Sequence, residues 1–171
     1  MSNVYIIADL HLGHENMAQH RGFNSAELHD EFIIHQWNSL VNKRDTVWIL
    51  GDVTMERAKD YQQLGRLNGI KKVILGNHDK PQHVQELLKW VNQVGGIVKY
   101  KGAWLTHCPV HPMELDYRVK YNIHGHIHEK KVLKNYRIFG KTIFSKPDTR
   151  YICVSCEHVD YQPVLLSSLI K

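Results

Sequence analysis

No long apolar run, disulfide framework or leader segment is visible in this sequence of 171 residues. No apolar stretch approaches the roughly 20 residues that a membrane-spanning helix needs, so we expect no membrane association. Three cysteines are an odd number and too few for a secreted disulfide scaffold. The N-terminal segment lacks basic residues and reaches its first charge at Asp9, too early for a signal peptide. We therefore expect a cytoplasmic protein.

Runs of like charge, low-complexity segments, internal repeats and linkers are also missing. The 22 Lys and Arg residues outnumber the 17 Asp and Glu residues, which gives a net charge of +5, but they are spread along the chain. This balance is typical of a solvated surface and is equally compatible with a phosphorylated or nucleotide ligand. Because no stripe of basic and aromatic residues of the kind that binds single strands is visible, a nucleic-acid partner has little support. The length suits a single domain, residues 1–171.

The first half of the chain alternates between apolar runs and amphipathic segments. We predict strands at residues 4–8, 47–50 and 73–75, and helices at 26–41, at 56–67 and after Pro81. This alternating order is the signature of a parallel sheet covered by helices. After residue 96 the chain becomes rich in strands, which we expect at 97–100, 103–106, 121–124, 136–139, 142–144 and 151–154. The predicted fold class is therefore α/β, with a second sheet and flanking helices.

The helix expected at residues 26–41 has one apolar face, formed by Ile33, Trp37, Leu40 and Val41. Asn24 and Glu27 have the spacing of an N-terminal capping box. His29 and His35 lie away from the apolar face, so we interpret both as surface residues.

Side chains that bind metals or move protons follow three of the expected strands. They are Asp9 and His11 after the first strand, Asp52 after the second, and Asn77, His78 and Asp79 after the third. Glycines at 51 and 76 allow the chain to turn sharply at two of these points. Because ligands of open α/β sheets bind beyond the carboxyl ends of the strands, we expect these side chains to meet at one edge.

The second half of the chain adds histidines. His107 follows the strand at 103–106, and His126 and His128 lie two positions apart beyond Gly125. In an extended segment, residues i and i+2 point to the same side, so both histidines would face one site. We interpret His124, which precedes the bend at Gly125, as structural.

Together these segments supply seven candidate metal ligands, namely Asp9, His11, Asp52, Asn77, His107, His126 and His128. They offer imidazole nitrogens and carboxylate or amide oxygens without a thiolate, a set that suits Mn²⁺, Fe or Zn²⁺ in a catalytic rather than a structural site. Seven ligands are too many for one ion and reasonable for two ions that share a bridging carboxylate. The alternative is that these are polar loop residues that make local caps and turns.

The order of these motifs resembles that of the calcineurin-like metallophosphoesterases. The matching segments are Asp9-x-His11, Gly51-Asp52, Gly76-Asn77-His78-Asp79, His107 and Gly125-His126-x-His128. The segment from His11 to Asn16 and the ending from Tyr161 to Leu166 are similar to those of the small bacterial and phage members. The resemblance covers nearly the whole chain and implies a β-sandwich flanked by helices.

The resemblance also implies roles for individual residues. Asp9, His11 and His128 would hold one metal ion, Asn77, His107 and His126 would hold a second, and Asp52 would bridge them. Two ions about 3.5–4 Å apart can activate a bridging hydroxide for in-line attack on phosphorus. His78 would protonate the leaving oxygen, with Asp79 orienting it. Mn²⁺ is favoured for both positions, with Fe, Zn²⁺ and Ni²⁺ as alternatives.

The segment after Asp52 departs from the family pattern. Many members continue with a further Asp or Asn and an Arg that contacts phosphate, whereas Val53, Thr54 and Met55 offer no such group. Guanidinium groups match phosphate bidentately, so Arg21, Arg57 and Arg118 are candidates, with a surface charge as the alternative for each. His14 and Asn16 are candidates for substrate contacts or for a purely structural role. Cys153 and Cys156 have no second pair to complete a zinc site, and we interpret them as small buried residues.

The leading hypothesis is a phosphoesterase that depends on a dinuclear metal centre. Phosphodiesters are favoured over monoesters because the short chain has no obvious insertion to enclose a large monoester. Cyclic nucleotides, nucleotide-derived diesters and nucleic-acid ends are the substrates considered. The alternatives are a nuclease or a phosphomonoesterase of the same fold, and a catalytically silent scaffold that binds a partner. The oligomeric state stays open.

Overall fold

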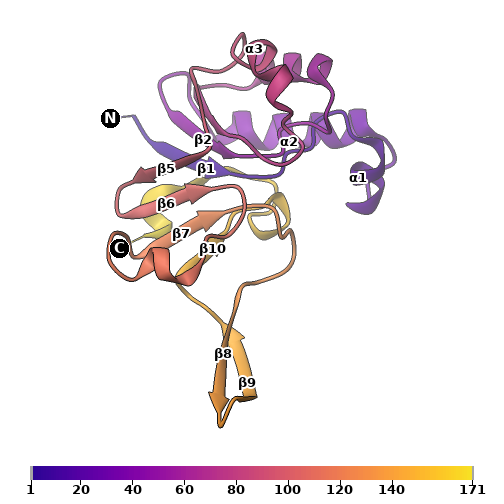
Figure 1. The fold of residues 1–171 in the computed structure, drawn as a ribbon. Coiled ribbons are helices and arrows are strands. Elements are labelled where there is room, and N and C mark those ends of the chain that lie inside the picture. Colours follow the sequence, from indigo (N-terminus) through magenta and orange to yellow (C-terminus); the bar gives the residue numbers. More distant parts are fainter. Residues whose placement is uncertain (1, 171) are drawn as a thin grey trace.

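Two β-sheets stacked face to face form the centre of the protein, in a computed structural model that describes residues 2–170 (Figure 1). In spatial order the first sheet contains β11 (Val164–Leu165), β1 (Val4–Ile7), β2 (Thr46–Leu50), β3 (Ile70–Ile74) and β4 (Gln93–Gly95). The second contains β10 (Tyr151–Cys153), β7 (Tyr121–His124), β6 (Ala103–Thr106) and β5 (Ile97–Tyr100). Strands β1 to β4 pair in parallel, as do β6, β7 and β10, whereas β11 and β5 are antiparallel edge strands. The predicted two-sheet α/β fold is confirmed.

Alternation along the strands of the first sheet produces two separate cores. On β1, Tyr5 and Ile7 pack against the helices, whereas Ile6 and the following Ala8 pack between the sheets. Successive side chains of a strand point to opposite faces, so a run that is apolar throughout serves both layers. This explains why the first-sheet strands appear in the sequence as continuous apolar runs.

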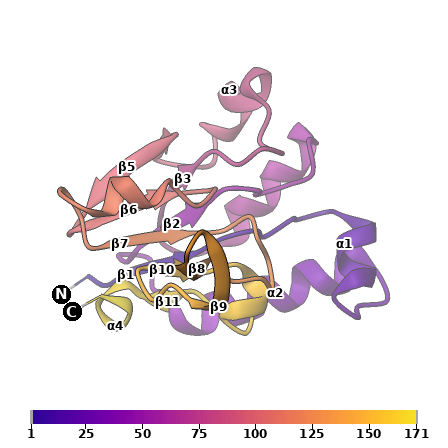
Figure 2. The same cartoon turned by 60° about the horizontal axis from the view of Figure 1, so that its bottom comes forward.

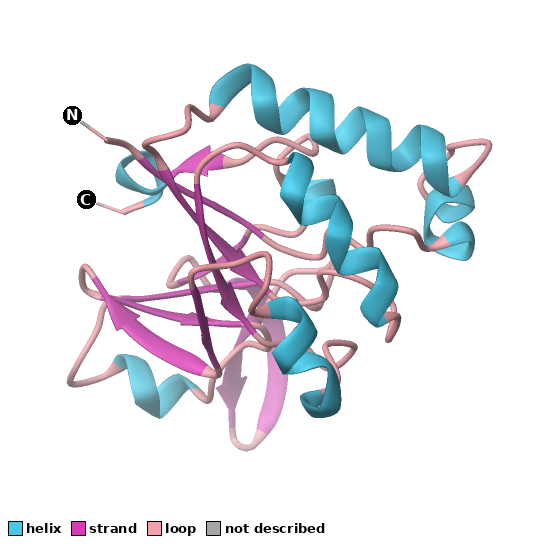
Figure 3. Ribbon diagram, turned by 90° about the horizontal axis from the view of Figure 1, so that it is seen from above, coloured by secondary structure: helices cyan, strands magenta, loops and turns pink. Residues whose placement is uncertain are grey.

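The helices lie mainly against the outer face of the first sheet (Figure 3). They are α1 (Glu15–His20), α2 (Ala26–Leu40), η1 (Ala58–Arg66), η2 (Pro81–His83) and α3 (Val84–Leu87), with η4 (Cys156–His158) and α4 (Leu166–Leu169) near the C-terminal end. Helix α2 buries Ile33 and Trp37, and the Trp37 indole donates to the carbonyl of Asn68 at 2.9 Å. Within residues 2–170, no helix combines the length and hydrophobicity needed to cross a membrane.

Several helix details differ from the sequence predictions. The N-cap of α2 is Ser25, whose Oγ accepts from the amide of Leu28, so Asn24 is not the cap. Leu40 is 39% exposed rather than part of the buried face. The helix expected at 56–67 is the 3₁₀ helix η1, whose buried Tyr61 and Leu64 are three residues apart. That spacing matches the three-residue turn of a 3₁₀ helix.

The outer face of the second sheet is covered by the segment after β6, which includes the short 3₁₀ helix η3 (Pro112–Leu115). Trp104 Nε1 donates to the carbonyl of Glu114 at 3.3 Å, and Tyr151 Oη donates to the carbonyl of Val110 at 2.8 Å. Both side chains point away from the inter-sheet core, because their neighbours in sequence, Leu105 and Ile152, belong to it.

Strands β8 (Leu133–Ile138) and β9 (Lys141–Pro147) form a separate hairpin. The sequence predicted the segments 136–139 and 142–144 as part of the second sheet, and this assignment is wrong. The hairpin extends away from the sandwich in Figure 1, and Figure 2 shows it in front of the second sheet's strands. All of β9 and most of β8 are exposed, because lysines on the strands interrupt any apolar face that could pack on a sheet.

Candidate metal centre

The predicted ligands converge where the carboxyl ends of strands from both sheets meet. The amide of Asp9 donates to the carbonyl of Gly51 at 3.0 Å, which joins the ends of β1 and β2. The amide of His126 donates to the Asp9 carboxylate at 3.0 Å, and His107 Nδ1 donates to the carbonyl of Leu50 at 2.9 Å. These bonds link the ends of the second-sheet strands to the first sheet. Segments distant in the sequence thus enclose one site, as expected for this edge of an α/β sheet.

Five of the seven candidate ligands have left-handed backbone conformations. They are Asp9 (φ 58°), His11 (φ 49°), Asp52 (φ 50°), His126 (φ 70°) and His128 (φ 48°). For residues other than glycine such a conformation costs of the order of 1 kcal/mol each and is concentrated at functional sites. The abrupt turns after β1, β2 and β7 direct these five side chains into the same volume.

The reason given for placing His126 and His128 together is wrong, although both reach the site. The segment after β7 bends and turns instead of continuing as an extended strand. His126 contacts His107, whereas the ring of His128 stacks on that of His11 with centroids 5.4 Å apart. Each histidine therefore belongs to a different group of ligands.

The first group consists of Asp9, His11 and His128, whose ligand atoms all lie within 4.8 Å of one another. Both ring nitrogens of His11 are buried without a hydrogen-bond partner among the described residues. Burial lowers the pKa of His11 to about 3, so its imidazole is neutral with a free lone pair. A buried neutral imidazole that lacks a protein partner fits a metal ligand.

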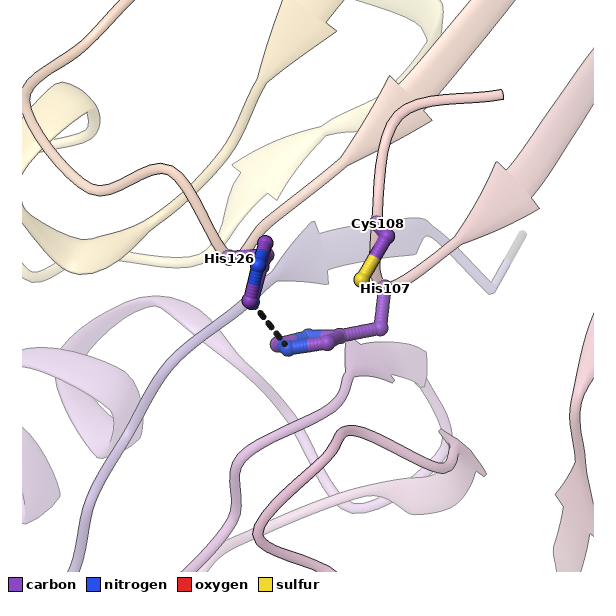
Figure 4. Close-up of side chains that lie close together, drawn as sticks. All are labelled: His107, Cys108 and His126. Carbon is purple, nitrogen blue, oxygen red and sulfur yellow. Dashed lines mark hydrogen bonds between the residues drawn. The ribbon is translucent and has the colours of Figure 1, made fainter. Parts of the chain in front are cut away.

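The second group surrounds His107. Its Nε2 lies 2.8 Å from Asn77 Oδ1 and 3.2 Å from His126 Nδ1. Figure 4 shows His107 and Cys108 on the chain leaving β6, with His126 opposite them on the segment after β7. His107 Nδ1 donates to the Leu50 carbonyl, an orientation typical of metal-bound histidines. In this structure Nε2 donates to Asn77 Oδ1, and although burial lowers the pKa of His107, Asp52 and Asp9 outweigh it and raise that pKa. A metal ion at Nε2 would take the place of this proton.

Cys108 also lies in this second group, and the sequence interpretation missed it. Its position directly after His107 was the available signal. Burial raises the pKa of the Cys108 thiol, and the Asp52 and Asp9 carboxylates add to this effect. Since the thiolate is the form that binds metals, a raised pKa leaves Asn77 as the better third ligand beside the two histidines.

Asp52 lies between the two groups. Its Oδ2 is 3.3 Å from His107 Nε2 and 3.9 Å from His11 Nε2, while Oδ1 accepts from the amide of His78 at 2.9 Å. Burial alone would raise the pKa of this carboxyl, but its bonds with His107 and the His78 amide hold the pKa below its ordinary value. An ionised carboxylate between two sets of imidazoles has the placement of a bridging ligand.

His78 stands at the open side of the site with its side chain 26% exposed. Its ring is 5.9 Å from that of His11, and its Nδ1 is 3.5 Å from a carboxylate oxygen of Glu56. It is therefore near both ligand groups while remaining accessible to a bound molecule.

The expected contact between Asp79 and His78 does not occur. The buried Asp79 carboxylate accepts from the amides of Gly76 and Val53 and from the hydroxyl of Tyr61. Burial raises its pKa despite these bonds. Asp79 thus fixes the turns that carry Asp52 and Asn77, and the carboxylate facing His78 is that of Glu56, which the sequence interpretation did not single out.

Arg21 is a structural residue, which corrects its assignment as a candidate substrate contact. Its side chain is 1% exposed, and it donates to the Glu157 carboxylate and to the carbonyls of Asp9 and Leu10. Glu157 in turn accepts from His128 Nδ1 at 3.1 Å. The Arg21–Glu157 pair therefore holds the ring of His128 and the backbone of Asp9, both candidate ligands. These bonds leave no Arg21 donor for phosphate.

His29 is buried, contrary to the sequence interpretation, whereas His35 is exposed as predicted. Arg21 donates to His29 Nε2 at 2.9 Å, so the proton on Nδ1 points to Asp30 at 3.1 Å. Asp30 also accepts from the amide of Gly13. His29 can be buried away from the apolar face of α2 because both of its ring nitrogens have hydrogen-bond partners. The spacing of apolar residues along the sequence cannot reveal such partners.

The other candidate substrate contacts lie around the entrance. His14 is half-buried, with its ring centroid 6.0 Å from that of His11, and Asn16 is exposed on α1. Arg57 pairs with Asp60, and Arg118 lines a separate cavity of about 490 Å³ with Lys101 and Lys120. A substrate role for His14 and Asn16 stays a prediction.

The remaining structural interpretations fit the structure. His124 is buried, and its Nδ1 donates to the carbonyl of Gly125. Cys153 and Cys156 are free thiols, half-buried and buried respectively, and burial raises the pKa of Cys156 to about 12.

Gly125 offers a direct test of how tightly the site is packed. A Cβ at this position would lie 2.5 Å from Asp9 Oδ2 and 2.6 Å from the Ala8 Cβ. We expect Gly125→Ala to lower the free energy of unfolding by about 1–3 kcal/mol and to reduce metal binding, because the loop carrying His126 must move. Denaturant unfolding and metal titration measure both effects. Gly96→Ala is the control, since no atom lies within 4 Å of its Cβ, and an equal loss there would contradict the packing argument.

No family model matches the chain. Over its full length the chain is 29% identical to an uncharacterized protein of Methanocaldococcus jannaschii, and the match covers 91% of that protein. A segment of 86 residues, 47% of this chain, is 42% identical to the gene 66 protein of Mycobacterium phage L5 and covers 42% of it.

Two solved structures extend the comparison. A protein of unknown function from Aquifex aeolicus superimposes with a TM-score of 0.68 over 99% of this chain and 100% of its own, at 23% identity. The two proteins therefore share a fold. An archaeal phosphodiesterase matches with a TM-score of 0.49 and 16% identity, covering 90% of this chain and 82% of its own. A likeness at that level says nothing about the activity of this chain.

Proposed function

We propose that the protein is a metal-dependent phosphoesterase whose site holds two divalent ions, with phosphodiesters as its preferred substrates. The observation that carries this proposal is the position of Asp52 between His11 and His107. His11 clusters with Asp9 and His128, whereas His107 clusters with His126 and Cys108 and also with Asp52 and Asp9, so Asp9 is common to both sides. The order of motifs along the chain, which resembles that of the calcineurin-like metallophosphoesterases, supports the same assignment.

The residues have distinct tasks in this proposal. Asp9, His11 and His128 hold one ion, and Asn77, His107 and His126 hold the other, with Asp52 shared between them. Bound ions would neutralise phosphoryl oxygens. They would also lower the pKa of a metal-bound water towards about 7, so that hydroxide is present at neutral pH. Mn²⁺ is the favoured ion because the set combines imidazole with carboxylate and amide oxygens, and Fe, Zn²⁺ and Ni²⁺ are the alternatives.

The charges around the site favour a diester over a monoester. A phosphodiester carries one negative charge, whereas a monoester carries close to two at neutral pH. The arginine nearest the ligands, Arg21, is paired with Glu157 inside the protein, and Arg57 is paired with Asp60. Neither of these two arginines is therefore free to compensate the second charge of a monoester.

His78 is the proposed general acid, and removing it tests that role. We expect His78→Ala to leave metal content unchanged and to slow cleavage of the dinucleotide TpT about 100-fold or more, because its alkoxide leaving group needs a proton. Bis(p-nitrophenyl) phosphate, which releases a stable phenolate, should slow less than about tenfold. Steady-state rates on both substrates measure the difference, with the exposed His35→Ala as control. Equal slowing of both substrates would remove His78 from the acid role.

The test of the function itself compares two activated esters. Metal-stripped protein is assayed on bis(p-nitrophenyl) phosphate and p-nitrophenyl phosphate, with and without Mn²⁺. We expect turnover that requires the metal and favours the diester. If two ions are bound and neither ester is cleaved, the proposal fails for these esters and the alternative of a silent binding scaffold gains weight.

A further inference from the structure

The β8–β9 hairpin exposes an unusual amount of apolar surface for a segment that packs on no sheet. Ile138, Ile143 and Phe144 are each more than half exposed, and Phe139 at the tip is fully exposed. Phe139 and Gly140 both have positive φ angles, 48° and 79°, which defines a two-residue hairpin turn. Asn, Asp or Gly normally occupies the first position of such a turn, so a bulky aromatic residue there is strained and has no packing within the protein to offset it.

The same segment concentrates positive charge. Residues 130–147 contain Lys130, Lys131, Lys134, Arg137, Lys141 and Lys146 and no acidic residue. The rest of the chain contains the other 16 of the 22 basic residues and all 17 acidic residues, so its charges nearly cancel. The net positive charge of the protein is therefore a property of this hairpin and its root.

Strand pairing places aromatic rings and ammonium groups on one face of the hairpin. Tyr136 pairs with Phe144, and their rings stack at 4.5 Å with an interplanar angle of 10°. Lys134 pairs with Lys146, and both ammonium groups lie over the Tyr136 ring, at 5.7 and 5.0 Å from its centroid. A cavity of about 350 Å³ lies against this face, lined by Lys134, Tyr136 and Lys146 together with Arg150 and Asp148, which pair with each other.

The root of the hairpin adjoins the candidate metal centre. Four residues, Glu129 to Val132, connect His128 to the first residue of β8, and the carbonyl of Lys130 accepts from His158 Nε2. A second cavity, of about 480 Å³, is lined by Met17 and His20 of α1 and by residues 126–130, which include His126, His128 and Lys130 as well as the acidic Glu129. Basic groups thus extend from the tip of the hairpin to the edge of the site.

We propose that the β8–β9 hairpin binds single-stranded nucleic acid, with bases stacking on its aromatic face and phosphates held by its lysines. Single strands are bound without sequence preference by basic grooves combined with aromatic side chains, and this face has both. Arg137 and Lys141 flank the tip, but the face that combines stacked rings with ammonium groups, formed by Lys134, Tyr136, Phe144 and Lys146, extends to the root, with Lys134 about 15–20 Å from Phe139 at the rise of a β-strand. A bilayer entered by the tip would leave that face unused, so a single strand is the better match. The binding does not depend on catalysis, but the further statement that the bound strand is a substrate rests on the proposed phosphodiesterase function.

Fluorescence anisotropy with a labelled 20-nucleotide oligo(dT) tests the proposal on full-length protein in EDTA at low salt. We expect wild-type protein to bind, and Lys134→Glu combined with Lys146→Glu to weaken binding at least tenfold. The slope of log K against log salt should fall in magnitude by about 1.4, the value for two lost phosphate contacts on a single strand. Tyr136→Leu, which keeps an apolar strand residue without a stacking ring, should weaken binding about tenfold.

The matched control is Lys43→Glu combined with Arg44→Glu, the same change of charge in an exposed loop outside the hairpin. It should change affinity less than about twofold, and a loss equal to that of the hairpin variant would overturn the proposal. Absence of oligonucleotide binding by the wild type would also overturn the proposal. So would a result in which Lys134 and Lys146 are required for binding to phosphatidylserine vesicles, or for self-association, but not for binding to the oligonucleotide. Unchanged Mn²⁺-dependent hydrolysis of bis(p-nitrophenyl) phosphate by the hairpin variants would separate binding from catalysis. Failure of that hydrolysis in the wild type would count against the proposed function alone.

Discussion

Replacing Asp52 by asparagine is expected to remove both metal ions together and to lower metal-dependent turnover by roughly 100-fold or more. Asp52 Oδ2 is close to His11 of one ligand group and His107 of the other, so its charge serves both. Loss of groups that merely orient a ligand lowers metal affinity or activity about 10–100-fold, and loss of a shared ligand should exceed this. Metal content after dialysis, measured by mass spectrometry, and turnover of a diester test the prediction.

Asp160→Asn is the control for the loss of one carboxylate. Asp160 is exposed and has a φ of 50°, a conformation that asparagine tolerates, so this variant should retain both ions and full activity. If the Asp52 variant retained two ions per chain, Asp52 would not be the bridging residue.

The second large effect is expected at Glu157. In metal-free protein at pH 7, Glu157→Gln should lower the free energy of unfolding by roughly 3 kcal/mol, because the buried Arg21 guanidinium loses its counter-charge. The matched control is Glu31→Gln. It removes the same charge from an Arg–Glu pair whose two side chains are 44% and 59% exposed, and should cost less than about 1 kcal/mol. Urea unfolding of both variants measures the difference.

The effect of Glu157→Gln should depend on pH in a defined direction. Burial would raise the pKa of Glu157, but His128 and Arg21 outweigh it and hold the pKa at about 2, below the ordinary value of 4.5. The unfolded chain therefore takes up the proton first as the pH falls. The stabilisation is present in full above about pH 4.5 and is lost as the pH falls towards 2. A difference between wild type and variant that stayed constant from pH 6 to pH 3 would show that charge is not the cause.

The sequence could predict which candidate ligands converge because their positions follow directly from local pattern. An apolar run that ends at Asp52 or Asn77 reveals a strand end, and topology then brings strand ends to one edge. The roles of Arg21 and His29 could not be found in this way, because each depends on a partner far along the chain or on an adjacent turn. Arg21 meets Glu157 across 136 positions, and only the folded chain shows that this pair leaves no donor for substrate.

The hairpin illustrates a second limit of sequence patterns. Tyr136 and Phe144 suggested strands correctly, but alternation alone could not show that these strands leave the sandwich. The face that carries them also escaped notice, because Lys134 and Lys146 are twelve positions apart and become neighbours only through strand pairing. A stripe of basic and aromatic residues can thus be divided between two strands and be absent from any single stretch of sequence.

The left-handed conformations of Asp9, His11, Asp52, His126 and His128 have an evolutionary consequence. Glycine would relieve the strain at each of these positions, so mutation and drift acting on stability alone would replace the ligands. A lineage without the proposed metal chemistry would be free to relieve this strain by substitution at these positions. Asp and His at these five positions would therefore persist in descendants only where selection for the proposed metal binding opposes this pressure.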